Sequence, residues 1–210
     1  MNISVIIPTR GSEREAFVKH LTGHLLPYQT RQPDEVILID HEPTQEGSDQ
    51  GERLAEGMSK AKGDLVLIME DDDWYASNYI EEISSYWEQF KEPHLIGYAE
   101  TIYYNIFSNR YRRMHHPGRS SLFSTGVSQY VAKKFRWDAP EKYIDIKLWN
   151  TFKGDTLSHG FQYSAIGIKH GIGLTGGNGH DDNFMNNLDE NGIILQSCVD
   201  VPSYEFYKSL

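Results

Sequence analysis

The segment Gly63-Asp64-Leu65-Val66-Leu67-Ile68-Met69-Glu70-Asp71-Asp72-Asp73-Trp74-Tyr75 joins an apolar run directly to four consecutive carboxylates. A run of five apolar residues entered through Gly-Asp is typical of a strand buried on both faces. Four adjacent carboxylates repel one another unless water or a cation neutralises them, and oxygen-only clusters suit hard divalent ions such as Mg²⁺ or Mn²⁺. The segment therefore predicts a buried strand that ends in a cation site.

An aspartate triplet before a helix also has a purely structural explanation. Aspartates cap helices and favour the positive end of the helix dipole, so such a triplet is often only a solvated turn. Here the triplet follows a buried strand directly, and Trp74 and Tyr75 stand where a solvated turn would carry small polar residues. These two features favour the functional interpretation.

Composition limits the class of protein. A chain of 210 residues with 39% hydrophobic and 12% aromatic residues suits one globular domain with a sizeable core. The single cysteine, Cys198, excludes an internal disulfide framework and a cysteine-rich zinc site, as is typical of a reducing compartment. Short apolar runs and an N-terminus without a signal-peptide pattern lead us to expect a cytoplasmic protein with no integral membrane association. The net charge of −10 argues against wholesale wrapping of nucleic acid.

Two earlier strands are expected to end beside the acidic segment. Ile3–Ile7 reads as a buried strand stopped by Pro8, and Asp34–His41 reads as a second strand that closes on a carboxylate. The spacing of these strands implies right-handed crossovers and a parallel sheet, so Thr9, Asp40 and the acidic segment should emerge at one edge. Ligands of open α/β sheets bind at that edge.

The rest of the chain alternates between helical and extended patterns. A capping box of Ser12 with Glu15 predicts a helix that buries Phe17, Leu21 and Leu25. Further helices are expected over residues 51–62, over a stripe of Ile80, Ile83, Trp87 and Phe90 with Ser77 or Asn78 as its cap, over Val127–Phe135, and over Tyr143–Lys153. Further strands are expected over His94–Ala99, Thr101–Phe107 and Phe161–Ile168.

Two segments have unusual compositions. Residues 109–119 hold two histidines, no acid and four arginines, namely Arg110, Arg112, Arg113 and Arg119. This segment is either an exposed loop or hairpin with a solvated face, or a contact for a diphosphate or a phosphate-bearing acceptor. Residues 167–179 hold six glycines and lead to His180, which makes His180 the first histidine candidate for a ligand and His170 the second.

Three of these segments resemble a known family. Ile3–Thr9, Val36–Asp40 and Gly63–Tyr75, in this order and spacing, resemble the nucleotide-sugar-binding half of family 2 glycosyltransferases. The resemblance is strong over residues 1–95 and looser to about residue 182. It implies an α/β protein with the GT-A (nucleotide-diphospho-sugar transferase) fold, a mostly parallel central sheet flanked by helices. It also implies a single domain over residues 1–210, made of a nucleotide-sugar-binding half (1–95), an acceptor and catalytic half (96–182) and a C-terminal tail (183–210).

The resemblance also implies residue roles on the donor side. The base and ribose of the nucleotide would lie near Pro8, Thr9, Arg10 and Asp40, with Arg53 and Asp64 as helpers. The acidic segment is similar to the family's Asp-x-Asp motif, in which a divalent ion bridges the donor diphosphate. Asp72 is then the first choice as metal ligand, followed by Asp71 and Asp73, and Glu70 stands at the usual first aspartate. The glycine-rich segment resembles the part of the family that closes over the donor and supplies a metal-binding histidine, here His180 or His170.

On the acceptor side, residues 144–149 resemble the family's Glu-Asp segment on a helix, whose aspartate is the general base. This implies Asp145 as the catalytic base. Ile144 replaces the glutamate of that pair, so Asp138, Glu141 and Asp155 remain alternatives.

The resemblance thus implies a glycosyltransferase that depends on Mn²⁺ or Mg²⁺. It would move a sugar from a nucleoside-diphosphate sugar, such as a UDP-sugar, to an acceptor hydroxyl with inversion. A carbohydrate is the preferred acceptor, and a nucleic acid bound by the four arginines ranks below it. Two alternatives stay open, namely a nucleotidyl or phosphoryl transferase that uses the same carboxylates, and a non-catalytic nucleotide-sugar-binding module.

Overall fold

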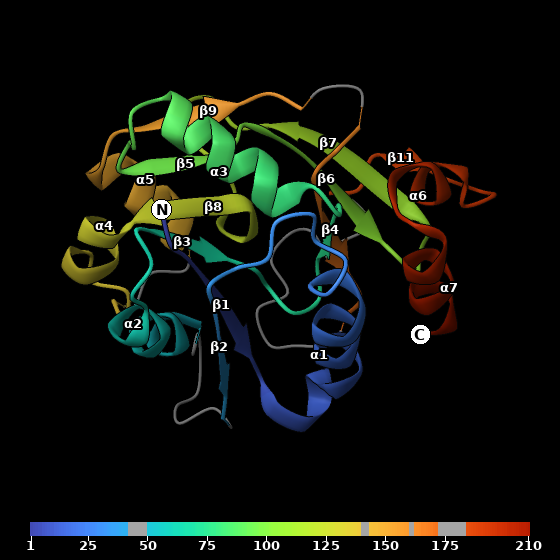
Figure 1. The fold of residues 1–210 in the computed structure, drawn as a ribbon. Coiled ribbons are helices and arrows are strands. Elements are labelled where there is room, and N and C mark those ends of the chain that lie inside the picture. Colours follow the sequence, from blue (N-terminus) through green and yellow to red (C-terminus); the bar gives the residue numbers. More distant parts are fainter. Residues whose placement is uncertain (42–49, 140–142, 160–161, 172–183) are drawn as a thin grey trace.

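The computed structural model describes residues 1–41, 50–139, 143–159, 162–171 and 184–210, and their strands form two sheets (Figure 1). The first sheet has the order β2 (Glu35–Asp40), β1 (Ile3–Thr9), β3 (Leu65–Ile68), β8 (Thr125–Ser128), β5 (Leu95–Tyr98) and β9 (Gly154–Leu157). The second has the order β11 (Asn187–Leu188), β7 (Arg110–His115), β6 (Glu100–Asn105), β10 (Ala165–Lys169) and β4 (Trp74–Tyr75).

The first three strands along the chain form the predicted parallel unit. β1 lies between β2 and β3, and its register places Ile6 beside both Ile37 and Ile68. Alternate residues of β1 enter two different cores, because side chains alternate across a strand. Ile3, Val5 and Ile7 pack in the core that contains α1 (Glu15–His20), and Ile6 packs in the core that contains α2 (Gln50–Lys60). Figure 1 shows these helices on opposite faces of the sheet.

Two predicted details of the early helices are wrong. Ser12 lies within a 3₁₀ turn, Gly11–Arg14, which Gly11 opens with a φ of +68°, so α1 begins at Glu15 and has no capping box. Phe90 is 39% exposed rather than part of the buried stripe. The reason is that α3 (Tyr79–Gln89) ends just before it, and Lys91 and Glu92 turn the chain away with positive φ.

The first sheet is mostly parallel, as predicted, because the pairs β1–β2, β1–β3 and β5–β9 are all parallel. Antiparallel strands complete both sheets. β8 runs antiparallel to both β3 and β5, and β7 runs antiparallel to β6 in a hairpin turned by Asn109. β8 also replaces the start of the helix predicted over Val127–Phe135. Val127 is paired with Val66 and Leu95 in the sheet, and α4 (Gln129–Lys134) begins only after the N-cap residue Ser128.

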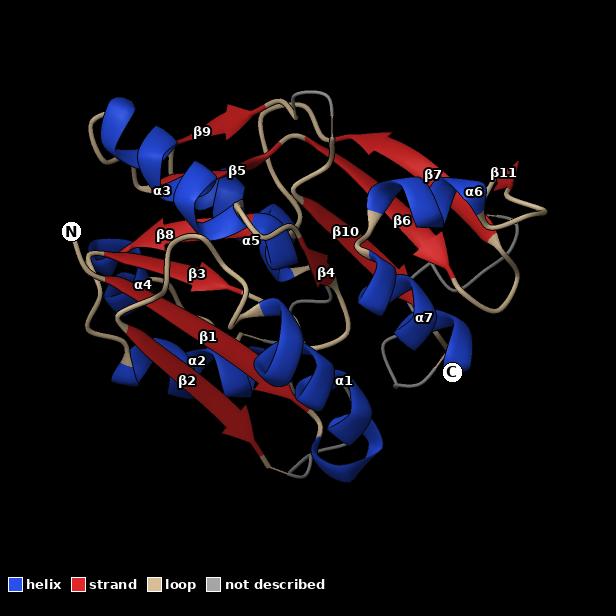
Figure 2. Cartoon of the chain, turned by 45° about the vertical axis from the view of Figure 1, so that its right-hand side comes forward, coloured by secondary structure: helices blue, strands red, loops and turns tan. Residues whose placement is uncertain are grey.

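The remaining helices lie in the second half of the chain (Figure 2). They are α5 (Ile144–Thr151), α6 (Ile193–Cys198) and α7 (Val201–Ser209). Leu195, Val199 and Tyr207 from the C-terminal segment enter the same core as α1. In the described parts of the chain, no helix is both long enough and apolar enough to span a bilayer.

Candidate functional site

The acidic residues form the turn through which the chain passes from one sheet to the other. Residues 70–73 connect β3 of the first sheet to β4 of the second. The carboxylate of Asp73 accepts the backbone N–H of Ile168 in β10 at 2.8 Å, and the N–H of Glu70 donates to the hydroxyl of Tyr75 at 2.8 Å. These bonds hold the turn rigidly at the point where the two sheets meet.

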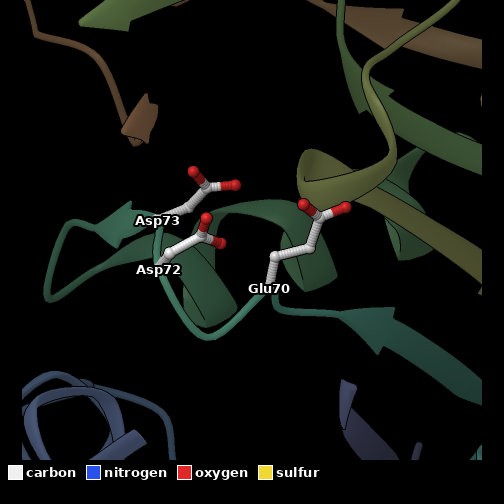
Figure 3. A group of neighbouring side chains, drawn as sticks. All are labelled: Glu70, Asp72 and Asp73. Carbon is white, nitrogen blue, oxygen red and sulfur yellow. The ribbon is translucent and has the colours of Figure 1, made fainter. Parts of the chain in front are cut away.

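Three carboxylates of this turn approach one another (Figure 3). Glu70, Asp72 and Asp73 each offer an oxygen, these oxygens lie within 4.8 Å of one another, and the three side chains stand on the same side of the turn. Asp73 is fully buried, and its Oδ2 has no hydrogen-bond partner in the described residues. Because a buried carboxylate oxygen is costly when it is unpaired, this geometry fits the oxygen ligand set of a divalent cation. Glu70 thus joins the predicted ligands Asp72 and Asp73 in one group of carboxylates that could hold a metal ion.

The electrostatics of the turn favour a bound cation. Burial, with Asp72 adding to it, raises the pKa of Glu70 to about 7 and that of Asp71 also to about 7. Burial likewise raises the pKa of Asp73 well above its usual range. Burial alone would raise the pKa of Asp72 as well, but Arg14 and His170 hold it well below its usual range. Additional positive charge beside these groups would favour their ionised forms.

Two cations that the sequence analysis missed lie at this turn. Nη1 of Arg14 is 2.7 Å from Asp72 Oδ2 and 3.2 Å from Asp71 Oδ1. The pKa of Lys169 is raised in spite of its burial, because Asp73, Asp72 and Glu70 favour its charged form. Both residues lie next to strand ends, Arg14 in the turn after β1 and Lys169 at the end of β10. That position was the available sequence signal, since cations at the carboxyl ends of strands meet the acidic segment.

Of the two predicted histidine ligands, the structure places His170 beside the acidic turn. Its Nε2 is 2.8 Å from Asp72 Oδ2, the side chain is fully buried, and its ring lies 4.3 Å from that of Phe17. His170 therefore contacts the first-choice metal ligand directly. His180 lies outside the described residues.

The predicted nucleotide-binding residues gather at the carboxyl ends of β1 and β2. Thr9 is paired with Asp40 across the two strands, and its hydroxyl donates to Asp71 Oδ2 at 2.6 Å. Pro8 and Arg10 flank Thr9 in the chain. The buried Arg53 of α2 donates to the carbonyl of His41, directly after β2, at 2.5 Å. These residues thus lie on the β1 and β2 side of the acidic turn.

Asp64 does not belong to this group. It precedes β3, and its carboxylate accepts the backbone N–H of Asn2 at 2.8 Å. Because β1 and β3 are parallel, this contact lies at the amino ends of the strands, opposite the acidic turn. The prediction that Asp64 assists nucleotide binding is therefore corrected, and its side chain instead holds the N-terminus against β3.

Asp145 lies in the first turn of α5, where Nη1 of Arg119 is 2.5 Å from its Oδ2. Burial raises the pKa of Asp145, and Arg119 opposes the rise. The Tyr103 phenol interacts electrostatically with Asp145 and with Asp73 of the acidic turn. Burial raises the pKa of the Tyr103 phenol, and both Asp145 and Asp73 add to the rise.

The alternative bases have other environments. Asp138 is exposed, with an Arg136 Nε to Asp138 Oδ1 distance of 3.3 Å. Asp155 is exposed on the edge strand β9, and Glu141 lies outside the described residues.

Most arginine side chains of residues 109–119 make contacts within the protein. Arg110 and Arg112 donate to the carbonyls of Met185 and Phe184 at 3.4 and 3.2 Å, and Arg112 also lies over the Phe184 ring. Arg119 is the partner of Asp145, while Arg113 is exposed. These internal contacts use three of the guanidinium groups that the sequence analysis considered for an anion.

The two sheets and their flanking helices define a GT-A fold. The chain is similar to S. aureus TarS 1-349 in complex with UDP-GlcNAc, with a TM-score of 0.57 and 10% identity over 99% of this chain and 78% of that one. The corresponding UDP complex gives a TM-score of 0.56 and 11% identity over 97% and 77% of the two chains. Against the longer S. aureus TarS structure, the TM-score is 0.52 at 13% identity, and the match covers 80% of this chain and 37% of that chain.

At these identities the likeness establishes the fold and confirms the predicted GT-A architecture. No protein-family profile and no curated protein sequence matches the chain.

Proposed function

We propose that this chain is a glycosyltransferase that moves a sugar from a UDP-sugar to an acceptor hydroxyl. The observation that carries the proposal is the group of three carboxylates at the strand ends, Glu70, Asp72 and Asp73. It occurs in a fold shared with a protein whose structure contains UDP-GlcNAc. The acidic turn would hold the diphosphate end of the donor through a divalent ion, as in the Asp-x-Asp motif that it resembles.

The donor's nucleotide would lie on the β1 and β2 side of the turn. Asp40 is exposed at the end of β2 and offers carboxylate oxygens to ribose hydroxyls. Pro8, Thr9 and Arg10 would line the same edge, and Arg53 supports it from beneath through the carbonyl of His41. This arrangement supports a nucleoside diphosphate bound across the carboxyl ends of the strands.

Mn²⁺ or Mg²⁺ would be held by Glu70, Asp72 and Asp73, with His170 beside Asp72. Asp73 Oδ2, which has no hydrogen-bond partner among the described residues, and the oxygen-only donor set fit either ion. When bound, such an ion stabilises the charge that grows on the leaving diphosphate. The N–H of Ile168 donates to Oδ1 of Asp73, which fixes the direction in which Oδ2 of the same carboxylate points.

Asp145 is the proposed general base on the acceptor side. It would accept the proton of the acceptor hydroxyl as that oxygen attacks the sugar, and Arg119 would fix the direction of the carboxylate. Attack on the face opposite the diphosphate inverts the configuration of the sugar carbon. A carbohydrate is the proposed acceptor, because three of the four arginines considered for nucleic acid have internal contacts.

Thermal unfolding with UDP and UDP-GlcNAc, each with Mn²⁺, with Mg²⁺ or with EDTA, tests the donor site. A ligand that binds only the folded state adds about 2.7 kcal/mol of stability at a hundredfold excess over its Kd. We expect a metal-dependent rise of the melting temperature. The variant Asp72→Asn should lose it, while Asp64→Asn, at the other end of the same strand, should keep it.

The absence of a metal-dependent shift in the wild-type protein would refute the donor site. If the metal-dependent shift is observed, analysis of the reaction products distinguishes sugar transfer from nucleotidyl transfer. Released UDP supports sugar transfer, whereas released pyrophosphate would support nucleotidyl transfer instead.

A further inference from the structure

Arg14 makes an unusual set of contacts in the acidic turn. One nitrogen, Nη1, contacts both Asp71 and Asp72, while Nε has no hydrogen-bond partner in the described residues. The side chain is 12% exposed and lies 5.6 Å above the Phe17 ring. Arg14 is thus anchored by the acidic turn at one nitrogen and still has a donor to offer.

Arg14 and His170 both contact the same oxygen of Asp72, Oδ2. Oδ2 of Asp72 is 2.7 Å from Arg14 Nη1 and 2.8 Å from His170 Nε2, so both neighbours use the same atom. A cation that takes this oxygen must displace one of them. His170 is fully buried and packed against Phe17, whereas Arg14 extends from a short 3₁₀ turn at the edge of the site. Arg14 is therefore the neighbour that is free to leave.

The charges of the turn are consistent with such an exchange. With all four carboxylates ionised, Glu70, Asp71, Asp72 and Asp73 together with the cations Arg14 and Lys169 would carry a formal charge of −2. One divalent ion would neutralise that charge. The pairing of β10 with β6 fixes the backbone of Lys169, whereas Arg14 extends from a short 3₁₀ turn, so Arg14 is the cation that an incoming ion would displace.

We propose that Arg14 is a resident counterion of Asp72 that yields this carboxylate to the divalent ion and then binds the diphosphate of the donor. The inference rests on the proposed function and extends it to a residue in the turn after β1. A guanidinium released from Asp72 would lie beside the acidic turn, where the proposed diphosphate would supply an anion for it. Its planar fork of N–H donors matches phosphate oxygens in pairs, as an ammonium cannot.

The test measures two affinities by isothermal titration calorimetry, that of Mn²⁺ alone and that of UDP with saturating Mn²⁺. The variants are Arg14→Met, which keeps the apolar stem and removes the charge, and Arg14→Lys, which keeps the charge and removes the fork. Lys19→Met is the matched control, since Lys19 is an exposed cation of α1 paired with Glu15. Thermal unfolding establishes that each variant is folded.

The two affinities should change in opposite directions. Arg14→Met should bind Mn²⁺ alone roughly tenfold more tightly because the competing charge is gone, and should bind UDP roughly tenfold or more weakly because a charge-assisted contact is lost. Arg14→Lys should keep the wild-type affinity for Mn²⁺ alone and bind UDP more weakly. Lys19→Met should stay within about twofold of the wild type for both ligands.

Unchanged or weaker Mn²⁺ binding by Arg14→Met would overturn the counterion role, and unchanged UDP binding by both Arg14 variants would overturn the diphosphate contact. If the wild-type protein binds both Mn²⁺ and UDP, neither result contradicts the proposed function. A wild-type protein that binds neither Mn²⁺ nor UDP would refute the proposed function and this inference together. If Arg14→Met does not fold, the UDP affinity of Arg14→Lys decides the diphosphate contact.

Discussion

The indole nitrogen of Trp74 donates a hydrogen bond to Asp200 Oδ2 at 2.9 Å. Trp74 follows the acidic turn directly, and Asp200 is the N-cap residue of the C-terminal helix α7. Asp200 Oδ1 also accepts the backbone N–H of Ser203 at 3.0 Å and lies 2.8 Å from Nε2 of His24. One carboxylate thus connects the acidic turn, the helical segment after β1 and the last helix of the chain.

Replacing Asp200 with alanine should therefore destabilise the whole fold. The change removes a helix cap and leaves the largely buried Trp74 N–H without its acceptor, which together cost roughly 2 kcal/mol. Urea unfolding measures this difference. Glu205→Ala, an exposed acid in the same helix, is the control and should change the free energy of unfolding by less than about 0.5 kcal/mol. A similarly small effect of Asp200→Ala would contradict the role of this carboxylate.

Stability should fall in mild acid because of one buried and one half-buried histidine. Burial, with Arg119 and His115 adding to it, lowers the pKa of His116 to about 4, and burial with His24 lowers that of His20 also to about 4. An unfolded histidine titrates near about 6.5, so the unfolded state takes up the proton first. The stabilisation is therefore complete above about pH 6.5 and is lost as the pH falls toward about 4.

For His116 alone, the loss between about pH 6.5 and about pH 5 should be roughly 2 kcal/mol, measured by urea unfolding at several pH values. His116 is 3% exposed, so solvent screens its environment little. His116→Gln should unfold with a shallower pH dependence than the wild type. If the free energy of unfolding depends on pH equally in the two proteins, His116 is not the source of the pH dependence.

Asp145→Asn should reduce sugar transfer without affecting the donor. Loss of a general base typically slows the reaction by about 10² to 10⁴-fold. The remaining amide oxygen can still accept from Arg119, so the helix position should be kept. UDP binding measured by titration calorimetry should match the wild type. Asp138→Asn, at the exposed alternative base, should leave kcat unchanged. If instead Asp138→Asn lowers kcat and Asp145→Asn does not, Asp138 is the general base.

Two helical glycines, Gly57 in α2 and Gly23 in the π-helical segment Leu21–Leu25, should respond oppositely to alanine. A Cβ at Gly57 of α2 would lie 2.5 Å from Ile6 Cγ2, whereas a Cβ at Gly23 would meet no atom within 4 Å. Gly57→Ala should therefore cost roughly 1 to 3 kcal/mol through overpacking, and Gly23→Ala should be neutral or stabilise by up to about 1 kcal/mol. Urea unfolding of both variants measures the contrast. A stabilised Gly57→Ala protein would mean that α2 does not pack on β1 this closely.

Patterns local in sequence predicted the first half of the fold. The apolar runs of β1 and β3 and the abrupt change to carboxylates after Met69 define buried strands and a polar strand end without further information. The strand identity of Thr125–Ser128 was not visible, because its pairing with β3 and β5 overrides a pattern that also suits a helix.

The charge partners of the site were less predictable than its carboxylates. Arg14 and Asp72 are 58 positions apart, and their contact depends on a 3₁₀ turn that the sequence analysis took for the start of a helix. Asp64 was misplaced for the converse reason. It is close to the acidic residues in sequence, but a buried strand separates it from them in space.

The passage of the chain from one sheet to the other through the acidic turn would give the proposed nucleotide a structural role. A molecule held by Asp72 and Asp73 on one side and by the ends of β1 and β2 on the other would clasp the two sheets together. If the sheets part, Asp73 loses the N–H of Ile168 and the binding surface is no longer assembled. Donor binding should therefore protect backbone amides from exchange in both sheets at once, and not only near the ligand.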